Sequence, residues 1–424
     1  MKAWRSLKMR DTNFHFPKNP EVVKYPVYPG QFSVSGRLRA VKHLLTAGQS
    51  GLTEKLEKRY GKGIVLTSSG SAALVLALTY SGAGPGKEVI FSSFSCPNVI
   101  DAVLQSGAAP VFAKLDEQLS LSFEDVKKKV TRQTCAVILT HVYGRRENTA
   151  IIDWAKENGI AVIDDAAQAM FTKQADTFAG GLGDFGILSF GPSKPLASIG
   201  GGALIAPKEW LRQKANLPME QRSQVAADYQ IYIRNQRIQA VMKRKRHHPI
   251  SYMFRKAGAM PSMKATKLEA LPDKPAVVPV LRMHPAREAI IDDQLSRMDQ
   301  LVTASLQNLE TAGEIFAKAE ETNGVRMIQP QEGEHLNYLT IVFPRDEERY
   351  GCSVYLAERG IQTCWNYLPL GRIPIYETYA GEGGEDPLWK RVLSLPFKPP
   401  LQKEQVKYIA ESVLSYYEQK NKTE

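Results

Sequence analysis

Short apolar runs alternate with longer amphipathic segments through the first half of the chain. Runs of four or five apolar residues bounded by Gly, Pro and polar residues are typical of buried parallel strands. We expect strands at 64–67, 88–91, 111–115, 136–140, 160–163, 187–190 and 202–206, and helices at 52–60, 72–80, 98–106, 122–130, 149–158 and 207–215. This alternation predicts an α/β fold with a mostly parallel sheet and right-handed crossovers.

The pattern changes in the second half of the chain. A long helical period covers about residues 285–318, and it is followed by expected strands at 336–343 and 362–367 and helices at 353–359 and 403–417. Four prolines break up residues 1–50, which we expect to form an irregular surface arm around the body or a partner subunit. The predicted units are therefore an N-terminal arm (1–50), a large domain (51–217), a basic insertion (218–280), and a long helix with a smaller C-terminal α/β domain (281–424).

The positive charge of this protein is concentrated in one segment. The 424 residues carry a net charge of +11, but ten Lys and Arg and no acidic residue lie between 229 and 268, so the remaining residues carry only +1. This distribution does not predict nucleic-acid binding by the whole protein. The basic amphipathic helix expected within 231–246 could contact an anionic membrane surface or a phosphorylated substrate. A solvated face or a subunit contact is the more ordinary explanation.

Other features favour a cytoplasmic protein. No apolar run is long enough to span a bilayer, and no apolar core follows the charged residues 1–8 as it would in a signal peptide. The four cysteines are widely spaced, without a CxxC pair or a His at metal-ligand spacing. We therefore expect reduced thiols and no metal site.

Two apolar runs end in residues that can carry chemistry. The first run, 160–163, is followed by Asp164 and Asp165. The second run, 185–190, is followed by a Gly-Pro turn that leads to Lys194. Because ligands of open α/β sheets bind at the carboxyl ends of the strands, Asp165 and Lys194 can face one ligand. A carboxylate for a pyridinium nitrogen and a lysine for an imine are what pyridoxal phosphate (PLP) requires of a protein. Taken singly, Asp165 could be a helix cap and Lys194 a solvated turn residue.

The junction between the first expected strand and its helix is a candidate phosphate site. It contains Ser68, Ser69, Gly70 and Ser71. The free N–H groups at the start of a helix bind anions such as phosphate. Simple N-capping by Ser69 or Ser71 explains the same residues.

Several short motifs follow one another in a fixed order. They occupy 67–74, 107–112, 141–144, 165–169, 183–185, 189–190 with Lys194, 201–203, 358–361 and 393–396. Together they resemble the DegT/StrS-type family of PLP-dependent sugar aminotransferases, from about residue 52 to 414 except across the basic segment. The resemblance implies a PLP-dependent transferase type I fold, of the aspartate-aminotransferase type, and a homodimer with sites at the subunit interface.

The same resemblance implies roles for individual residues. Lys194 would bind the cofactor covalently and then act as the general base of the proton shift, and Asp165 would pair with the pyridinium nitrogen. The remaining implied contacts are Gln168 with the ring hydroxyl, Gly70, Ser71 and Ser189 with the phosphate, Cys96 with the ring, and Asn366 and Tyr367 with the substrate.

Four positions depart from the family pattern. Cys96 stands where an aromatic residue usually stacks on the ring, and Gly200 stands where an acid usually precedes 201–202. Val280 lies beside the stretch 281–287, which resembles the segment that often carries an asparagine reaching the other subunit's phosphate. Asn366 stands where histidine is common. We expect these departures to change cofactor or substrate contacts without removing the Lys194–Asp165 pair.

The resemblance thus implies transfer of an amino group from glutamate or glutamine to a keto group on a nucleotide-linked sugar, for amino-sugar or surface-polysaccharide biosynthesis. Two alternatives remain open at this point. One is a PLP-dependent sugar dehydratase on the same fold, and the other is a non-catalytic PLP-fold regulator or assembly partner.

Overall fold

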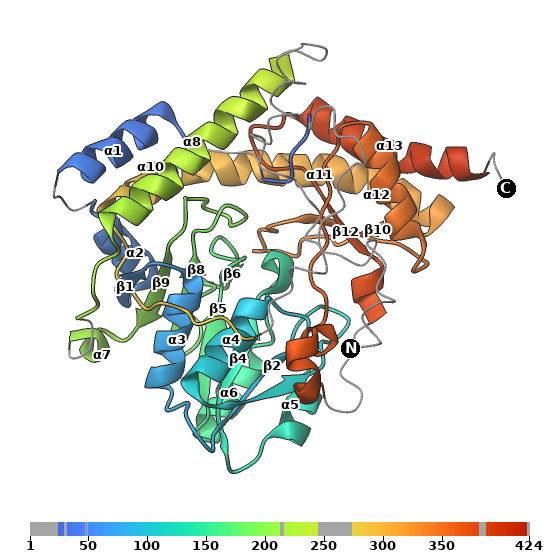
Figure 1. Cartoon of the computed structure of the whole chain (residues 1–424). Coiled ribbons are helices and arrows are strands. Elements are labelled where there is room, and N and C mark those ends of the chain that lie inside the picture. The colour runs from blue at the N-terminus through green and yellow to red at the C-terminus, as the bar shows by residue number, and fades with distance from the viewer. Residues whose placement is uncertain are drawn as a thin grey trace.

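The computed structural model describes residues 24–28, 32–46, 48, 50–212, 216–244, 274–380 and 387–421 (Figure 1). Its central feature is a seven-stranded sheet with the strand order β1-β9-β8-β5-β4-β2-β3. The strands are β1 (Gly63–Thr67), β2 (Glu88–Ser92), β3 (Ala109–Ala113), β4 (Thr134–Thr140), β5 (Ala161–Asp165), β8 (Phe185–Ser189) and β9 (Gly202–Ala206). β9 runs antiparallel to both its neighbours, and the other neighbouring strands pair in parallel. The predicted mostly parallel sheet is confirmed.

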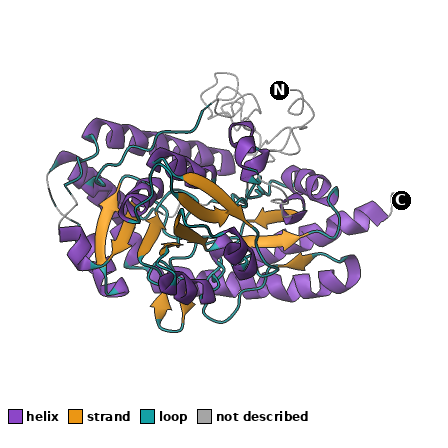
Figure 2. Ribbon diagram, turned by 90° about the horizontal axis from the view of Figure 1, so that it is seen from below, coloured by secondary structure: helices purple, strands orange, loops and turns teal. Residues whose placement is uncertain are grey.

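Helices cover both faces of this sheet, as Figures 1 and 2 show. Side chains on one face, such as Phe91 and Ile163, pack with α3 (Gly70–Tyr80) and α4 (Pro97–Ser106). Their neighbours Ile90 and Val162 point to the other face, where α5 (Phe123–Lys129) and α6 (Ala150–Glu157) lie. Successive strand residues alternate between the faces, and both faces are dry, so the strands are apolar throughout. Burial of each such side chain contributes roughly 1.5–3 kcal/mol.

The edge of the sheet formed by β1 is covered by further helices. Leu52 and Leu56 of α2 (Leu52–Tyr60) pack with Leu66 and with Ile291 of α10 (Pro285–Leu295). The short helix α7 (Lys208–Arg212) follows β9. A small separate hairpin of β6 (Lys173–Gln174) and β7 (Thr177–Phe178), not expected from the sequence, follows β5 and precedes β8 along the chain.

Part of the N-terminal arm is helical, so the expectation of an irregular segment is wrong for residues 34–45. Helix α1 (Val34–Leu45) begins at Ser33, whose Oγ accepts the N–H of Gly36. Its inner side contacts α10, where Asp293 accepts hydrogen bonds from Ser33, Ser35 and Arg39. Gly36 lets the two helices approach, because a Cβ there would lie 3.1 Å from the Asp293 carboxylate. Polar contacts to a distant helix, which no local pattern reveals, hold this element.

The smaller domain contains a three-stranded antiparallel sheet of β10 (Arg326–Met327), β11 (Leu339–Val342) and β12 (Val392–Leu395). Helices α11 (Met298–Asn323), α12 (Glu348–Glu358) and α13 (Lys403–Asn421) pack on it. The expected long helix over 285–318 is therefore two helices, α10 and α11, which break at Ser296 and Arg297.

The expected strand at 362–367 is also wrong. Within it, only Cys364 forms an isolated bridge, and its partner is Ser394 of β12. β12 takes the place beside β11 instead, and Trp365 and Tyr367 are buried in an irregular segment that packs against the large domain. Cys364, Trp365 and Tyr367 are buried by this interdomain packing, and their spacing imitates that of a strand.

Helix α8 (Arg222–Arg244) confirms a helix in the basic insertion. Its start is tied to the body, because Arg287 of α10 forms ion pairs with Asp228 in α8 and with Glu220 just before the helix. The expected membrane contact of residues 229–268 falls largely on 245–268, which lie outside the described residues. Within the described ranges, no helix is both long and apolar enough to cross a membrane.

Candidate active site

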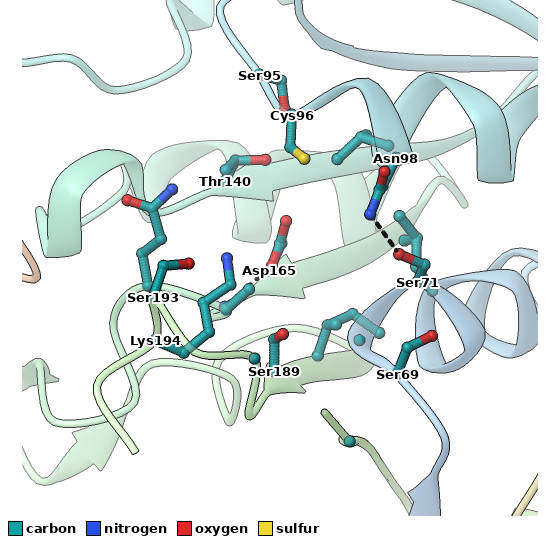
Figure 3. A pocket seen from close by; sticks show the side chains of 18 of the residues that line it. Ser69, Ser71, Ser95, Cys96, Asn98, Thr140, Asp165, Ser189, Ser193 and Lys194 are labelled. Atoms are coloured by element: carbon teal, nitrogen blue, oxygen red, sulfur yellow. Dashed lines mark hydrogen bonds between the residues drawn. The ribbon is translucent and has the colours of Figure 1, made fainter. Parts of the chain in front are cut away.

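A cavity of about 340 Å³ lies at the carboxyl ends of β5 and β8, beside the start of α3 (Figure 3). Its lining contains all but one of the residues that the sequence singled out as site residues: Gly70, Ser71, Cys96, Asp165, Gln168, Ser189, Lys194 and Tyr367. Asn366 does not line it. The contact recorded for Asn366 is through its backbone, whose carbonyl accepts a hydrogen bond from the hydroxyl of Tyr143.

Lys194 and Asp165 enter the cavity from two neighbouring strands. Asp165 is the last residue of β5, and Lys194 lies in the loop after β8, where its N–H bonds the carbonyl of Gly191 at 3.0 Å. Figure 3 shows both side chains pointing into the same space. Burial raises the pKa of Asp165, while the N–H of Ala167, 3.0 Å from Oδ1, and the charge of Lys194 oppose that rise. A cationic ring nitrogen would supply the counter-charge that this buried carboxylate needs.

The adjacent acid, Asp164, has a structural position on the opposite face of β5. Its Oδ2 accepts the N–H groups of Gly180 and Leu182 at 2.8 Å each, and its Oδ1 lies 2.7 Å from Nε2 of His141. The other ring nitrogen of His141 lies 2.8 Å from the carbonyl of Arg145. Since both acceptors suit an N–H donor, His141 is held as an imidazolium directly behind the Asp165 end of the sheet.

This buried pair predicts a stability change in alkaline solution. Burial lowers the pKa of His141, but Asp164 more than offsets it and the result is a rise from 6.5 to about 9. Because the folded-state pKa is the higher one, the stabilisation is complete below about pH 6.5 and is lost as the pH rises through about 9. We expect the difference in free energy of unfolding between wild type and His141→Gln, measured in urea, to shrink across that window. A difference that stays constant from pH 6 to 9.5 would contradict the assignment.

The start of α3 forms a second wall of the cavity. Ser69 caps the helix, and its Oγ and carbonyl take the N–H groups of Ala72 and Ala73. The N–H groups of Gly70 and Ser71 have no partner within the described part of the chain, so the cap leaves them for a ligand. Gly70 is required by space, because a Cβ there would lie 2.8 Å from the Cβ of Ser189.

Sequence reasoning missed several polar residues of the lining, namely Ser95, Asn98, Thr140 and Ser193. Asn98 donates from Nδ2 to the Ser71 hydroxyl at 3.1 Å (Figure 3). The hydroxyls of Ser95 and Thr140 are buried and have no hydrogen-bond partner among the residues described. Each of these residues follows or ends a strand, or begins the next helix, which is the signal that could have identified them.

Gln168 connects the two domains at the cavity. Its Oε1 accepts the N–H of Tyr143 at 3.0 Å, and its Nε2 donates to the hydroxyl of Tyr367. Cys96 precedes α4, and burial raises the pKa of its thiol, so a neutral thiol faces the cavity. Cys96 therefore places a small neutral thiol at the position where the family pattern usually has an aromatic ring.

The geometry explains the glycine at position 200. Gly200 has φ +123°, a conformation open mainly to glycine, and a Cβ there would lie 2.8 Å from Nη1 of Arg287. Arg287 donates to the carbonyl of Ile199 and is buried in its ion pairs with Glu220 and Asp228. A larger residue at position 200 would disturb this support of the loop that follows Lys194.

The donor set fits PLP: a lysine amine, a buried carboxylate, two open N–H groups at a helix start, and unpartnered hydroxyls all line one cavity. The fold and this site together define a PLP-dependent aminotransferase of the type I fold. Residues 51–414 match the profile of the DegT/DnrJ/EryC1/StrS aminotransferase family, and the chain belongs to that family. The resemblance seen in the sequence motifs is thereby confirmed.

Several known proteins are similar to the chain over most of its length. GDP-perosamine synthase of Vibrio cholerae is 28% identical over 379 residues, which cover 86% of this chain and 89% of that protein. The dTDP-4-dehydro-2,3,6-trideoxy-D-glucose 4-aminotransferase of Saccharopolyspora spinosa is 26% identical and covers 82% of this chain and 83% of its own length. The crystal structure of the aminotransferase TlmJ from Streptoalloteichus hindustanus superimposes with a TM-score of 0.72 at 21% identity, over 93% and 99% of the two chains.

Proposed function

We propose that the protein transfers an amino group from an amino acid, glutamate or glutamine, to a keto group on a nucleotide-linked sugar. The observation that carries the proposal is the placement of Lys194 and Asp165 in one cavity beside the open N-terminus of α3. The sugar part is supported by the names of the relatives, a perosamine synthase and a dideoxysugar 4-aminotransferase. Such products serve amino-sugar or surface-polysaccharide biosynthesis.

Each residue of the site would have a distinct role in this reaction. Bound PLP supplies the carbonyl that takes up the amino group and a ring that withdraws electrons from the reacting carbon. Asp165 would hold the proton on the ring nitrogen, and Gly70, Ser71 and Ser189 would bind the phosphate. The Lys194 amine would bind the cofactor covalently and, once released, would move a proton between the two carbons that exchange the amino group. Gln168 and Tyr367 would position the ring and the substrate, and burial would exclude water.

An assay with purified protein tests this proposal against its rivals. The protein, loaded with PLP, is incubated with L-glutamate or L-glutamine and a panel of keto-sugar nucleotides, and product masses are measured. We expect a product in which an amino group has replaced the keto oxygen. Loss of water from the sugar would favour a dehydratase, and no conversion of the cofactor by either donor would favour a non-catalytic regulator.

We also propose that the protein is a cytoplasmic homodimer that binds no nucleic acid. The family resemblance supports the dimer, and light scattering that gives the monomer mass would refute it. A contact of residues 229–268 with an anionic membrane surface rests on their charge and on α8, and flotation with anionic liposomes at low salt tests it.

A further inference from the structure

A second lysine is buried close to Lys194, in a place that the resemblance does not explain. Lys398 follows β12 in the small domain and is only 7% exposed. Its ammonium donates to Oδ1 of Asn337 at 2.5 Å and lies 5.8 Å from the centre of the Tyr338 ring. An ammonium has three N–H donors, and Asn337 takes one of them.

The charge of Lys398 has no counter-charge nearby. Among the described residues, no Asp or Glu forms an ion pair with Lys398, and no carboxylate is among the groups that shift its pKa. Burial and the charge of Lys194 lower this pKa from 10.5 to about 7. A buried cation without an anion is costly, so this position would be stabilised by an anionic ligand.

Lys398 is connected to the catalytic loop through one side chain. Asn337 is fully buried, and its Nδ2 donates to the carbonyl of Ser193 at 3.2 Å, one residue before Lys194. Its N–H also bonds the carbonyl of Tyr143 at 2.7 Å. Ser193 and Lys194 both line the cavity. The small domain therefore holds the Lys398 ammonium in a fixed position against the loop that carries Lys194.

The proposed reaction brings an anion to this place. An amino-acid donor must put its nitrogen where the Lys194 amine reacts, and standard bond lengths place its carboxyl carbon about 2.5 Å from that nitrogen. Of the described residues that line the cavity, only Lys194 is cationic, and its amine is required for the chemistry. The donor's α-carboxylate thus needs a cation from just outside the lining.

We propose that Lys398 binds the α-carboxylate of the amino-acid donor and that Asn337 positions it for this contact. The inference rests on the proposed aminotransferase function and names the residue that selects α-amino acids as donors. A carboxylate and an ammonium form a charge-assisted hydrogen bond, which also supplies the missing counter-charge. Removal of the ammonium is expected to weaken donor binding without preventing the attachment of PLP.

The titratable neighbours His335, Cys364 and Tyr338 have pKa values outside the range from 6 to 9, so among these four groups only Lys398 changes its charge within it. Burial lowers the pKa of His335 to about 4, and burial raises the pKa of Cys364 to about 11. Burial raises the pKa of Tyr338 further still. Loss of the Lys398 proton would remove the charge that binds the carboxylate, so donor affinity should fall as the pH rises from about 6.5 to 8.5.

The test compares PLP-loaded wild type with Lys398→Met and Lys398→Arg. The probes are L-glutamate, followed by the absorbance change of the cofactor, and glutarate, a dicarboxylate without an amine, followed by calorimetry. We expect Lys398→Met to raise the apparent Kd of both about 10- to 100-fold, and Lys398→Arg to restore most of the affinity. The glutarate Kd should rise with pH in wild type and stay flat in Lys398→Met. Borohydride should fix PLP on Lys194 in all three proteins.

A matched control is Lys62→Met at the amino ends of β1 and β8, where the Lys62 ammonium bonds the carbonyls of Gly181 and Gly183. It should leave both Kd values unchanged. Equal glutarate affinity and equal pH dependence in wild type and Lys398→Met would overturn the proposal. If glutarate binding depends on Lys398 while L-glutamate and L-glutamine leave the cofactor unchanged, the carboxylate site stands and the proposed donor reaction fails.

Discussion

Lys194→Ala is expected to lower amino transfer about 10³-fold, because one side chain provides both the covalent attachment of PLP and the base that moves the proton. Positioned general bases contribute about 10²–10⁴-fold to such rates, and no other amine lines the described cavity. The measurement is the rate of cofactor conversion by L-glutamate, together with mass spectrometry of peptides after borohydride treatment. In wild type, borohydride should leave PLP on the peptide that contains Lys194.

Lys62→Ala is a suitable control for the loss of a lysine, since it lies at the opposite end of the strands. It should keep both the labelled peptide and the rate. A Lys194→Ala protein within about tenfold of the wild-type rate would assign the covalent role to another residue. An unlabelled Lys194 peptide in wild type, together with no conversion of the cofactor, would favour the non-catalytic alternative.

Asp165→Asn is expected to lower the rate about 10²–10³-fold while leaving the protein folded. The change keeps the shape of the side chain but removes the charge that would hold a proton on the ring nitrogen, and loss of one such electrostatic stabiliser typically costs this much. The measurement is the rate of cofactor conversion together with the urea midpoint. Because burial already raises the pKa of Asp165, the folded state loses little when that charge is removed.

The neighbouring acid provides a matched comparison. Asp164→Asn removes the partner of the buried His141 imidazolium and should cost about 3–5 kcal/mol of stability, measured in urea. Its effect on the rate of the folded protein should be the smaller of the two. If Asp164→Asn lost activity and Asp165→Asn lost only stability, the assignment of the two carboxylates would be reversed.

The strands and helices of the large domain could be predicted because their signals are local. Each strand is an uninterrupted apolar run between turn residues, and each helix has an apolar face that covers the sheet. The predictions failed where an element depends on a distant partner. Helix α1 is held by Asp293 of α10, and the segment 362–367, with its buried Trp365 and Tyr367, packs between the domains and does not form a strand.

The sequence by itself determined the order of strands and helices and the pair of residues, Asp165 and Lys194, that stand at the ends of two strands. The apolar pattern alone left two adjacent acids at the end of one strand, and the family resemblance implied Asp165; the structure gives the physical reason why Asp165 is the acid that faces the cavity. That follows from the alternation of side chains across β5, which sends Asp165 toward α3 and α4 and Asp164 toward His141.

The tertiary structure alone brought in the residues that come from far along the chain. Asn98, Asn337 and Lys398, which no sequence motif singled out, lie near Lys194 because strand crossovers and the packing of two domains bring their segments together. No sequence pattern distinguishes a buried lysine without an anionic partner from a surface lysine. Lys398 could therefore be recognised only from its burial in the structure. Local patterns therefore fixed the framework of this protein, and long-range packing decided the charges of its site.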